Sequence, residues 1–162
     1  MVQKVAKFEK ISLEQWRNDC PLSDDDVYND ILIPSRSTTE SAGYDFYSPY
    51  SVVLKSGEDY KFPTGIKCRI DNGWVLCAFP RSSLGFKYYT RLANTIGVID
   101  SDYYNNVNNE GHIWVKIRNE SDKEVVINKG DKIVQGIFLP YGITEDDNVD
   151  KTREGGLGST GK

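Results

Sequence analysis

The sequence predicts an all-β fold, either a barrel or a jelly roll, in a chain of 162 residues, which is about the size of one domain. Three observations lead to this prediction. Short apolar or alternating segments recur along the chain with turn residues between them, as in antiparallel architectures. The composition, with 14 Gly and 10 Tyr, favours strands and turns over a helical bundle. Hydrophobic residues make up 38% of the chain, which argues against disorder along most of its length.

Two of the expected strands have clear patterns. Residues 65–70 alternate, with Ile66, Cys68 and Ile70 on one face. Residues 74–79 form a continuous apolar run, which is typical of a central strand. Together with these two, the expected strands are residues 31–34, 44–47, 51–54, 59–62, 113–117, 124–127 and 133–139.

The first 30 residues differ from the rest of the chain. Residues 2–8 alternate weakly and predict an edge strand. Ser12 and Gln15 have the spacing of a capping box, in which the serine hydroxyl accepts a hydrogen bond from the backbone three residues later. We therefore expect a short helix that presents Trp16 on its apolar face and ends near Asp19.

Charge and cysteine content exclude several classes of protein. The net charge is −4, from 20 basic and 24 acidic residues, which disfavours a protein that coats nucleic acid. Cys20, Cys68 and Cys77 show no CxxC spacing, so neither a disulfide framework nor a zinc site is expected. The acidic run 24–26 is expected to be a solvated turn. No signal peptide or membrane-spanning run is visible, and we expect a cytoplasmic protein.

Several polar segments interrupt the strand pattern and offer chemistry. Residues 80–85 place an arginine and two hydroxyls at a strand end, where an oxyanion nest could form. Asp100 and Asp102 would share one face if the backbone is extended, so that one could activate water while an arginine anchors the other. The tail 153–161 has glycines that allow close approach to phosphate. The only histidine is His112, and a hydrolytic triad built on it is disfavoured.

Five short motifs, taken in order, resemble those of the trimeric dUTP diphosphatase (dUTPase) family of bacterial or phage type. They are residues 42–45 (AGYD), 80–85 (PRSSLG), 97–103 (GVIDSDY), 130–135 (GDKIVQ) and 155–161 (GGLGSTG). Each motif is short, but their order and spacing make the resemblance specific. It covers about residues 31–161.

The resemblance implies a distorted jelly-roll β-barrel that assembles as a homotrimer and exchanges C-terminal arms, with residues of three subunits in each active site. The implied reaction is hydrolysis of dUTP to dUMP and diphosphate with Mg²⁺ on the phosphates. It would keep uracil out of DNA and supply dUMP for thymidylate synthesis. The implied division is an N-terminal extension (1–30), a jelly-roll domain (31–143) and a flexible glycine-rich arm (144–162). No nucleic acid or membrane partner is implied.

The same resemblance implies roles around the base, the sugar and the reacting phosphorus. Asp100 matches the general base, which directs water at the α-phosphorus. Tyr103 matches the aromatic residue that packs under deoxyribose and leaves no space for a 2′-hydroxyl. The residues that match the uracil-reading hairpin are Asn94, Gly97, Val98, Ile99 and Trp114.

Further implied roles concern the phosphates. Ser82, beside Ser83, matches a hydroxyl that touches the triphosphate, and Arg81 is expected to buttress Asp102. No direct protein ligand to the metal is expected, and the groups implied to reach it through water are Asp45 and Gln135. The arm residues implied to cover the nucleotide are Arg153, Leu157, Gly158, Ser159 and Thr160, of which Ser159 and Thr160 match γ-phosphate contacts.

Three departures from the family pattern affect these expectations. Leu157 stands where the family has an aromatic residue that stacks on uracil, so we expect weaker closure. Arg153 lies one place after the usual arginine position, occupied here by Thr152, and can still reach the γ-phosphate because the segment is flexible. The expanded hairpin tip, residues 104–111, is either a surface insertion or a contact with a partner or neighbouring subunit.

Two alternatives remain beside hydrolysis. A dCTP deaminase would share the fold, but Lys116 stands where that family has a glutamate, and Phe86 replaces its arginine. A regulatory trimer that senses dUTP and binds a protein partner could use the N-terminal extension and the hairpin tip. Asp100 and Tyr103 favour retention of hydrolysis.

Overall fold

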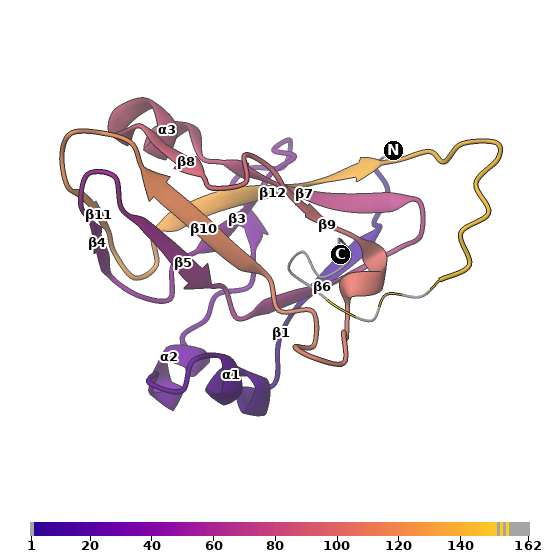
Figure 1. Cartoon of the computed structure of the whole chain (residues 1–162), viewed down its shortest axis with the longest axis horizontal. Helices are drawn as coiled ribbons and strands as arrows, with labels where there is room; N and C mark the ends of the chain where they lie inside the picture. The colour runs from indigo at the N-terminus through magenta and orange to yellow at the C-terminus, as the bar shows by residue number, and fades with distance from the viewer. Residues whose placement is uncertain (1, 152, 154, 156–162) are drawn as a thin grey trace.

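The computed structural model describes residues 2–151, 153 and 155 (Figure 1). The strands are β1 (Ala6–Lys10), β2 (Ser35–Arg36), β3 (Tyr44–Tyr47), β4 (Val52–Leu54), β5 (Asp59–Pro63), β6 (Ile66–Ile70), β7 (Trp74–Pro80), β8 (Thr90–Leu92), β9 (Gly97–Ile99), β10 (Trp114–Asn119), β11 (Val125–Ile127) and β12 (Lys132–Pro140). The helices are α1 (Leu13–Asp19), α2 (Asp25–Asn29) and α3 (Ser82–Tyr88), with a single 3₁₀ turn, η1 (Ser101–Tyr103).

The strands of the described residues are distributed over four sheets. The largest has the order β2-β3-β12-β7-β9, and a three-stranded sheet has the order β5-β10-β8. Strands β1 and β6 form one two-stranded sheet, and β11 and β4 form the other. Every pairing is antiparallel. The predicted all-β, jelly-roll fold class is confirmed, although the strands do not close into a continuous barrel.

One core joins these sheets. Phe46 and Leu76 of the large sheet and Phe62 of the three-stranded sheet belong to the same cluster of buried side chains. Burial of each such side chain stabilises the fold by about 1.5–3 kcal/mol. The packing is close at Gly136 in β12, where a Cβ would lie 2.8 Å from the Leu76 side chain.

The N-terminal residues pack into this same core. Strand β1 pairs with β6, so the predicted edge strand exists but lies at residues 6–10. The predicted helix is confirmed as α1, because the Gln15 N–H donates to the Ser12 hydroxyl over 3.0 Å. Trp16 is fully buried in the core cluster.

Two local predictions were wrong, and one helix was not predicted. Residues 31–34 form no strand, because Ile31 and Pro34 are buried and the two residues between them are exposed, a spacing of three rather than two. The acidic run 24–26 begins helix α2, where negative charge is favourable at the N-terminus. Residues 82–88 form helix α3, which has no buried residue and therefore no helical pattern of apolar side chains.

The helices of the described part are all short. None of those in residues 2–151 is long and apolar enough to span a bilayer.

Candidate active site

A cavity of about 380 Å³ opens where the large sheet and the three-stranded sheet diverge. Strand β9 pairs with β7 on one side, and β10 pairs with β8 on the other. The segment between β8 and β9 carries the chain from one sheet to the other. The residues that line the cavity are Lys61, Ala78, Leu92, Ala93, Asn94, Gly97, Ile99, Ile113, Trp114, Val115 and Lys116.

Most residues that were predicted to read uracil lie together in this cavity. Asn94, Gly97, Ile99 and Trp114 all line it. The Val98 side chain is 64% exposed and is absent from the described lining. A Cβ on Gly97 would approach the Ala78 Cβ to 3.2 Å, so glycine lets β9 lie close against β7. Contact of these residues with a base stays a prediction.

Lys61 is a member of the cavity that the sequence did not reveal. Its Nζ lies 4.1 Å from the centroid of the Trp114 ring, a cation–π contact at the cavity wall. Trp114 pairs with Pro63, so Lys61 is its diagonal neighbour across the ladder. The alternation of residues 59–62 placed Lys61 on a strand, but only the pairing register brings it to Trp114.

Asp100 and Asp102 lie directly after β9, on the same side of the chain. Asp100 precedes the 3₁₀ turn η1 and Asp102 lies within it. Their side chains are 49% and 56% exposed. Arg153 binds both, donating from Nη2 to Asp100 over 2.5 Å and from Nε to Asp102 over 2.8 Å. A tight turn, and not extended backbone, brings the two carboxylates to one guanidinium.

Arg81 does not buttress Asp102 within this chain. It donates to a carboxylate oxygen of Asp45, and Lys132 Nζ and Ser37 Oγ lie 2.7 and 2.9 Å from the other oxygen. Burial by itself would raise the pKa of Asp45, but the bonds from Lys132, Ser37 and Arg81 outweigh it and hold the pKa below its ordinary value. Asp45 therefore anchors two cations.

Gln135 joins this network through the strand pairing. It lies opposite Asp45 in the β3–β12 ladder, and its side-chain amide donates to the Pro80 carbonyl over 3.2 Å. A Cβ on Gly43 would lie only 2.6 Å from the Gln135 side-chain oxygen, so a larger residue there would displace the end of that side chain. Residues of the first, second and fourth motifs thus meet in one place.

Ser82 and Ser83 lie far from the two carboxylates. Both are exposed and begin helix α3, which Figure 1 shows on the left of the molecule, whereas the turn after β9 lies on the right. A single chain therefore does not bring these hydroxyls to Asp100. The arm, drawn in yellow after β12, turns back toward the turn after β9 of its own chain.

Tyr103 is held inside the fold next to the carboxylates. Its ring is 7% exposed, and the Arg153 guanidinium carbon lies 5.8 Å from the ring centroid. Of the other predicted arm residues, Leu157, Gly158, Ser159 and Thr160 lie outside the described residues.

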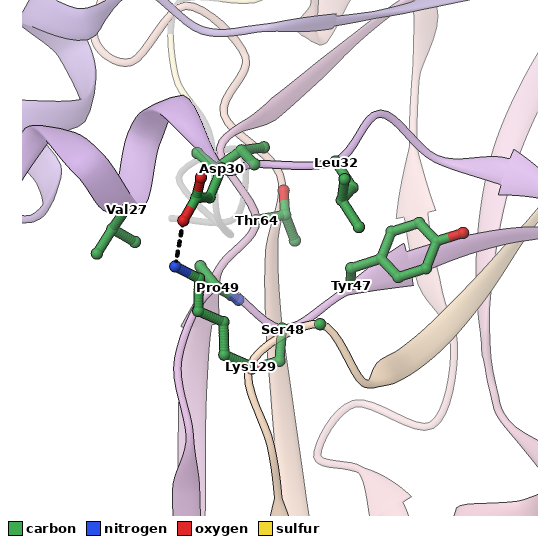
Figure 2. A pocket seen from close by; sticks show the side chains of 10 residues that line it. Val27, Asp30, Leu32, Tyr47, Ser48, Pro49, Thr64 and Lys129 are labelled. Atoms are coloured by element: carbon green, nitrogen blue, oxygen red, sulfur yellow. Dashed lines mark hydrogen bonds and ion pairs between the residues drawn. The ribbon is translucent and has the colours of Figure 1, made fainter.

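A second cavity, of about 360 Å³, lies where the N-terminal residues meet the sheets (Figure 2). Its lining includes Val27 and Asp30 of the N-terminal residues, Tyr47 of β3, and Thr64, which follows β5. Asp30 and Lys129 close it with an ion pair of 2.6 Å. None of its described lining residues belongs to the set predicted for the nucleotide, so the first cavity is the better candidate for the base.

Comparison with known proteins places this fold and site in a family. The dUTPase family model matches residues 29–161, and the chain belongs to the dUTPase family. It is 48% identical over 133 residues to the deoxyuridine 5′-triphosphate nucleotidohydrolase of Lactococcus lactis, covering 81% of this chain and 89% of the relative. The protein of the same name from Nautilia profundicola is 37% identical over 136 residues, covering 81% and 92%.

Solved structures agree with this assignment. The crystal structure of dUTPase from Streptococcus mutans matches with a TM-score of 0.69 and 38% identity, covering 85% of this chain and 98% of that one. The dUTPase from phage phi11 of S. aureus has a TM-score of 0.67 at 20% identity, covering 91% and 97%, and supports the fold alone.

Proposed function

We propose that this chain hydrolyses dUTP to dUMP and diphosphate. One observation carries the proposal: in a chain of the dUTPase family, a cavity lined by Asn94, Gly97 and Trp114 lies next to the turn that bears Asp100. The relatives of highest similarity reported above carry the name of that activity.

In this proposal Asp100 orients a water molecule and takes its proton. The water oxygen bonds to the α-phosphorus, the bond from that phosphorus to the bridging oxygen breaks, and diphosphate leaves with the electron pair. A half-exposed carboxylate has access to water and needs no special basicity if it holds the water in line with the leaving group. Arg153 must exchange its bond to Asp100 for the incoming phosphates, which a guanidinium binds well.

The proposal includes a homotrimer whose active sites lie between subunits. Ser82 and Ser83 are remote from Asp100 in one chain, so their contact with the same triphosphate requires a second copy. Exchange of the arms between copies, with Leu157, Ser159 and Thr160 over the nucleotide, belongs to the same proposal. The division into extension, jelly-roll domain and arm also stays a prediction, as does a cytoplasmic location.

We propose that hydrolysis depends on Mg²⁺ and that the phosphates of the substrate supply the ligands of this ion. The residues that the structure describes contain no group of three or more His, Cys, Asp or Glu placed to hold an ion. Asp45, expected to reach the metal through water, is buried with both oxygens bonded to protein groups, so within one chain it does not fit that role.

The test is product analysis with purified protein. We expect dUMP and diphosphate from dUTP with Mg²⁺, and little turnover of dCTP, dTTP or UTP. Conversion of dCTP to dUTP without release of diphosphate would show deaminase activity instead. Lys116, in the cavity wall, argues against that activity, because the deaminase family has a glutamate at this position. Binding of dUTP without turnover would support the regulatory trimer.

A further inference from the structure

We propose that Asp19, in the N-terminal helix α1, is a positioning residue that acts through His112 to hold Tyr103 and so sharpens discrimination between deoxyribose and ribose. The inference rests on the proposed function, in which Tyr103 packs under the sugar. Asp19 lies outside residues 29–161, the part that matches the family model. Asp19 would therefore add a residue of the N-terminal extension to the site residues of the family.

Two hydrogen bonds hold the Tyr103 hydroxyl in place. It donates to the His112 backbone carbonyl over 2.8 Å and accepts from the Asn109 side-chain amide over 2.8 Å. Burial raises the pKa of Tyr103, so the hydroxyl keeps its proton. The position of the ring therefore depends on where the backbone of His112 lies.

The position of His112 depends in turn on its side chain. The ring is fully buried, and its Nε2 accepts from the Gly65 backbone N–H over 2.8 Å. Nε2 thus carries no proton, so Nδ1 carries one and donates it to Asp19 Oδ2 over 2.6 Å. The hydrogen bonds assign a neutral imidazole with one tautomer.

Burial favours the neutral form of this histidine. Burial lowers the pKa of His112 below its ordinary value of 6.5, and Lys61 acts in the same direction. The carboxylates of Asp19 and Glu110 oppose this shift only in part. Removal of Asp19 would leave a buried N–H without its acceptor, a costly state that the ring can relieve only by moving.

The loop between Tyr103 and His112 transmits such movement. Gly111 has a φ of +80° and lies so close to the Tyr103 backbone that a Cβ there would collide with it. The His112 ring also lies 4.7 Å, between centroids, from the ring of Trp114. A shift of His112 therefore reaches the sugar-side ring and the base cavity together.

Helix α1 is firmly attached, so it can serve as the fixed end of this chain of contacts. Trp16, one turn before Asp19, is fully buried in the core. At the start of the helix, Ser12 donates from its backbone N–H and its hydroxyl to Glu110, over 3.0 and 2.5 Å. Lys67 Nζ lies 3.0 Å from the same carboxylate. The extension thus holds the hairpin on both sides of Gly111.

The hairpin tip also contacts the N-terminal residues, while its contact with a partner or neighbouring subunit stays a prediction. Within this chain, residues 104–111 bind the N-terminal residues: Glu110 binds Ser12, and the Tyr104 hydroxyl donates to Glu9. The insertion and the extension stabilise each other.

The experiment compares kcat/KM for dUTP with kcat/KM for UTP in Asp19→Ala, Asp19→Asn and Asp25→Ala. The ratio is independent of the fraction of folded enzyme, so a loss of stability alone leaves it unchanged. We expect Asp19→Ala to lower the ratio by on the order of tenfold, because a loosened Tyr103 admits the 2′-hydroxyl. Asp19→Asn should restore most of the ratio, because its amide oxygen still accepts from Nδ1. Asp25→Ala is the matched control, since this exposed carboxylate of the same extension pairs only with Arg17 among the described contacts.

A native ratio in Asp19→Ala, or an equal fall in Asp25→Ala, would overturn the proposal. The sole histidine provides a second readout, because its ¹⁵N imidazole resonances are unambiguous. We expect an Nδ1–H signal protected from solvent exchange in the native chain and lost in Asp19→Ala; an Nε2–H tautomer in the native chain would also overturn it. If the native chain did not hydrolyse dUTP, the proposed function would fail while the resonances would still test the network.

Discussion

The base cavity and the phosphate-binding motifs differ in how much of the assembly is needed to build them. The described walls of the cavity beside Trp114 come from one chain, since β5, β8 and β10 pair in one sheet and β7 and β9 pair in the other. Helix α3, which bears Ser82, and the turn after β9, which bears Asp100, are by contrast well separated in one chain (Figure 1). In the proposed function, base recognition would therefore depend on the fold of one subunit, whereas phosphate chemistry would depend on the way copies assemble.

The largest expected effect concerns Asp100, which lies next to the base cavity and acts at the phosphates in the proposed mechanism. Asp100→Asn should lower kcat by roughly 10²–10⁴-fold while the nucleotide still binds, because the amide keeps the shape but cannot take the proton. Steady-state kinetics together with calorimetric titration of a non-hydrolysable dUTP analogue would measure both. Asp102→Asn is the control, since it keeps the base and changes only its neighbour; full activity in Asp100→Asn would remove that residue from its role.

A mixing experiment tests whether the phosphate-binding motifs of two chains are needed to build one active site. Ser82→Glu places a negative charge where a phosphate is proposed to lie, on an exposed helix whose folding does not depend on that side chain. Alone, this variant and Asp100→Asn should both be inactive. When they are unfolded and reassembled together in equal amounts, about a quarter of the sites should combine a native Asp100 with a native Ser82 from another copy. An inactive mixture, beside a native sample treated in the same way, would place the site within one chain.

The pH dependence of stability should report the buried histidine next to the base cavity. Burial depresses the pKa of His112 in the folded chain, so the unfolded chain binds more protons below its ordinary value of 6.5. The stabilisation from a neutral His112 is thus present above pH 6.5 and is lost as the pH falls toward the folded-state pKa. Urea denaturation at pH 7.5 and 5.5 should show a loss of about 1 kcal/mol.

The control for this measurement is His112→Gln, which removes the only histidine and should flatten the profile between these two pH values. Carboxylates with depressed pKa values, such as Asp45, lose their contribution only at lower pH. Equal stability of the native chain at both values would contradict a buried neutral imidazole.

The smallest expected effect lies in the wall of the base cavity. Lys61→Met keeps the aliphatic stem but removes the charge over the Trp114 ring, a contact worth about 0.5–1 kcal/mol. We expect KM for dUTP to rise about two- to fivefold with little change in kcat. Lys55→Met, which changes an exposed lysine outside the described cavity lining, is the control. A change in kcat alone would show that Lys61 acts on the reaction at the phosphates and not on binding of the base.

Local patterns in the sequence were sufficient for much of the fold. The alternation of Ile66, Cys68 and Ile70 predicted strand β6, and the Ser12 cap predicted helix α1. Motif order brought Asn94, Gly97 and Trp114 into one hypothesis, and the structure places them in one cavity. Helix α3 was missed because its Phe86 and Tyr88 face outward, so no buried stripe marks it.

The sequence by itself determined the strand periods and the capped helix, because these depend on neighbours within a few positions, and the family resemblance implied the candidate nucleotide residues. Only the tertiary structure decided that Arg81 pairs with Asp45, that Arg153 joins Asp100 to Asp102, and that Asp19 orients His112. Those partners are separated by 36 to 93 positions in the chain. Periodicity fixes the face on which a side chain lies, whereas strand register and packing fix which distant side chain it meets.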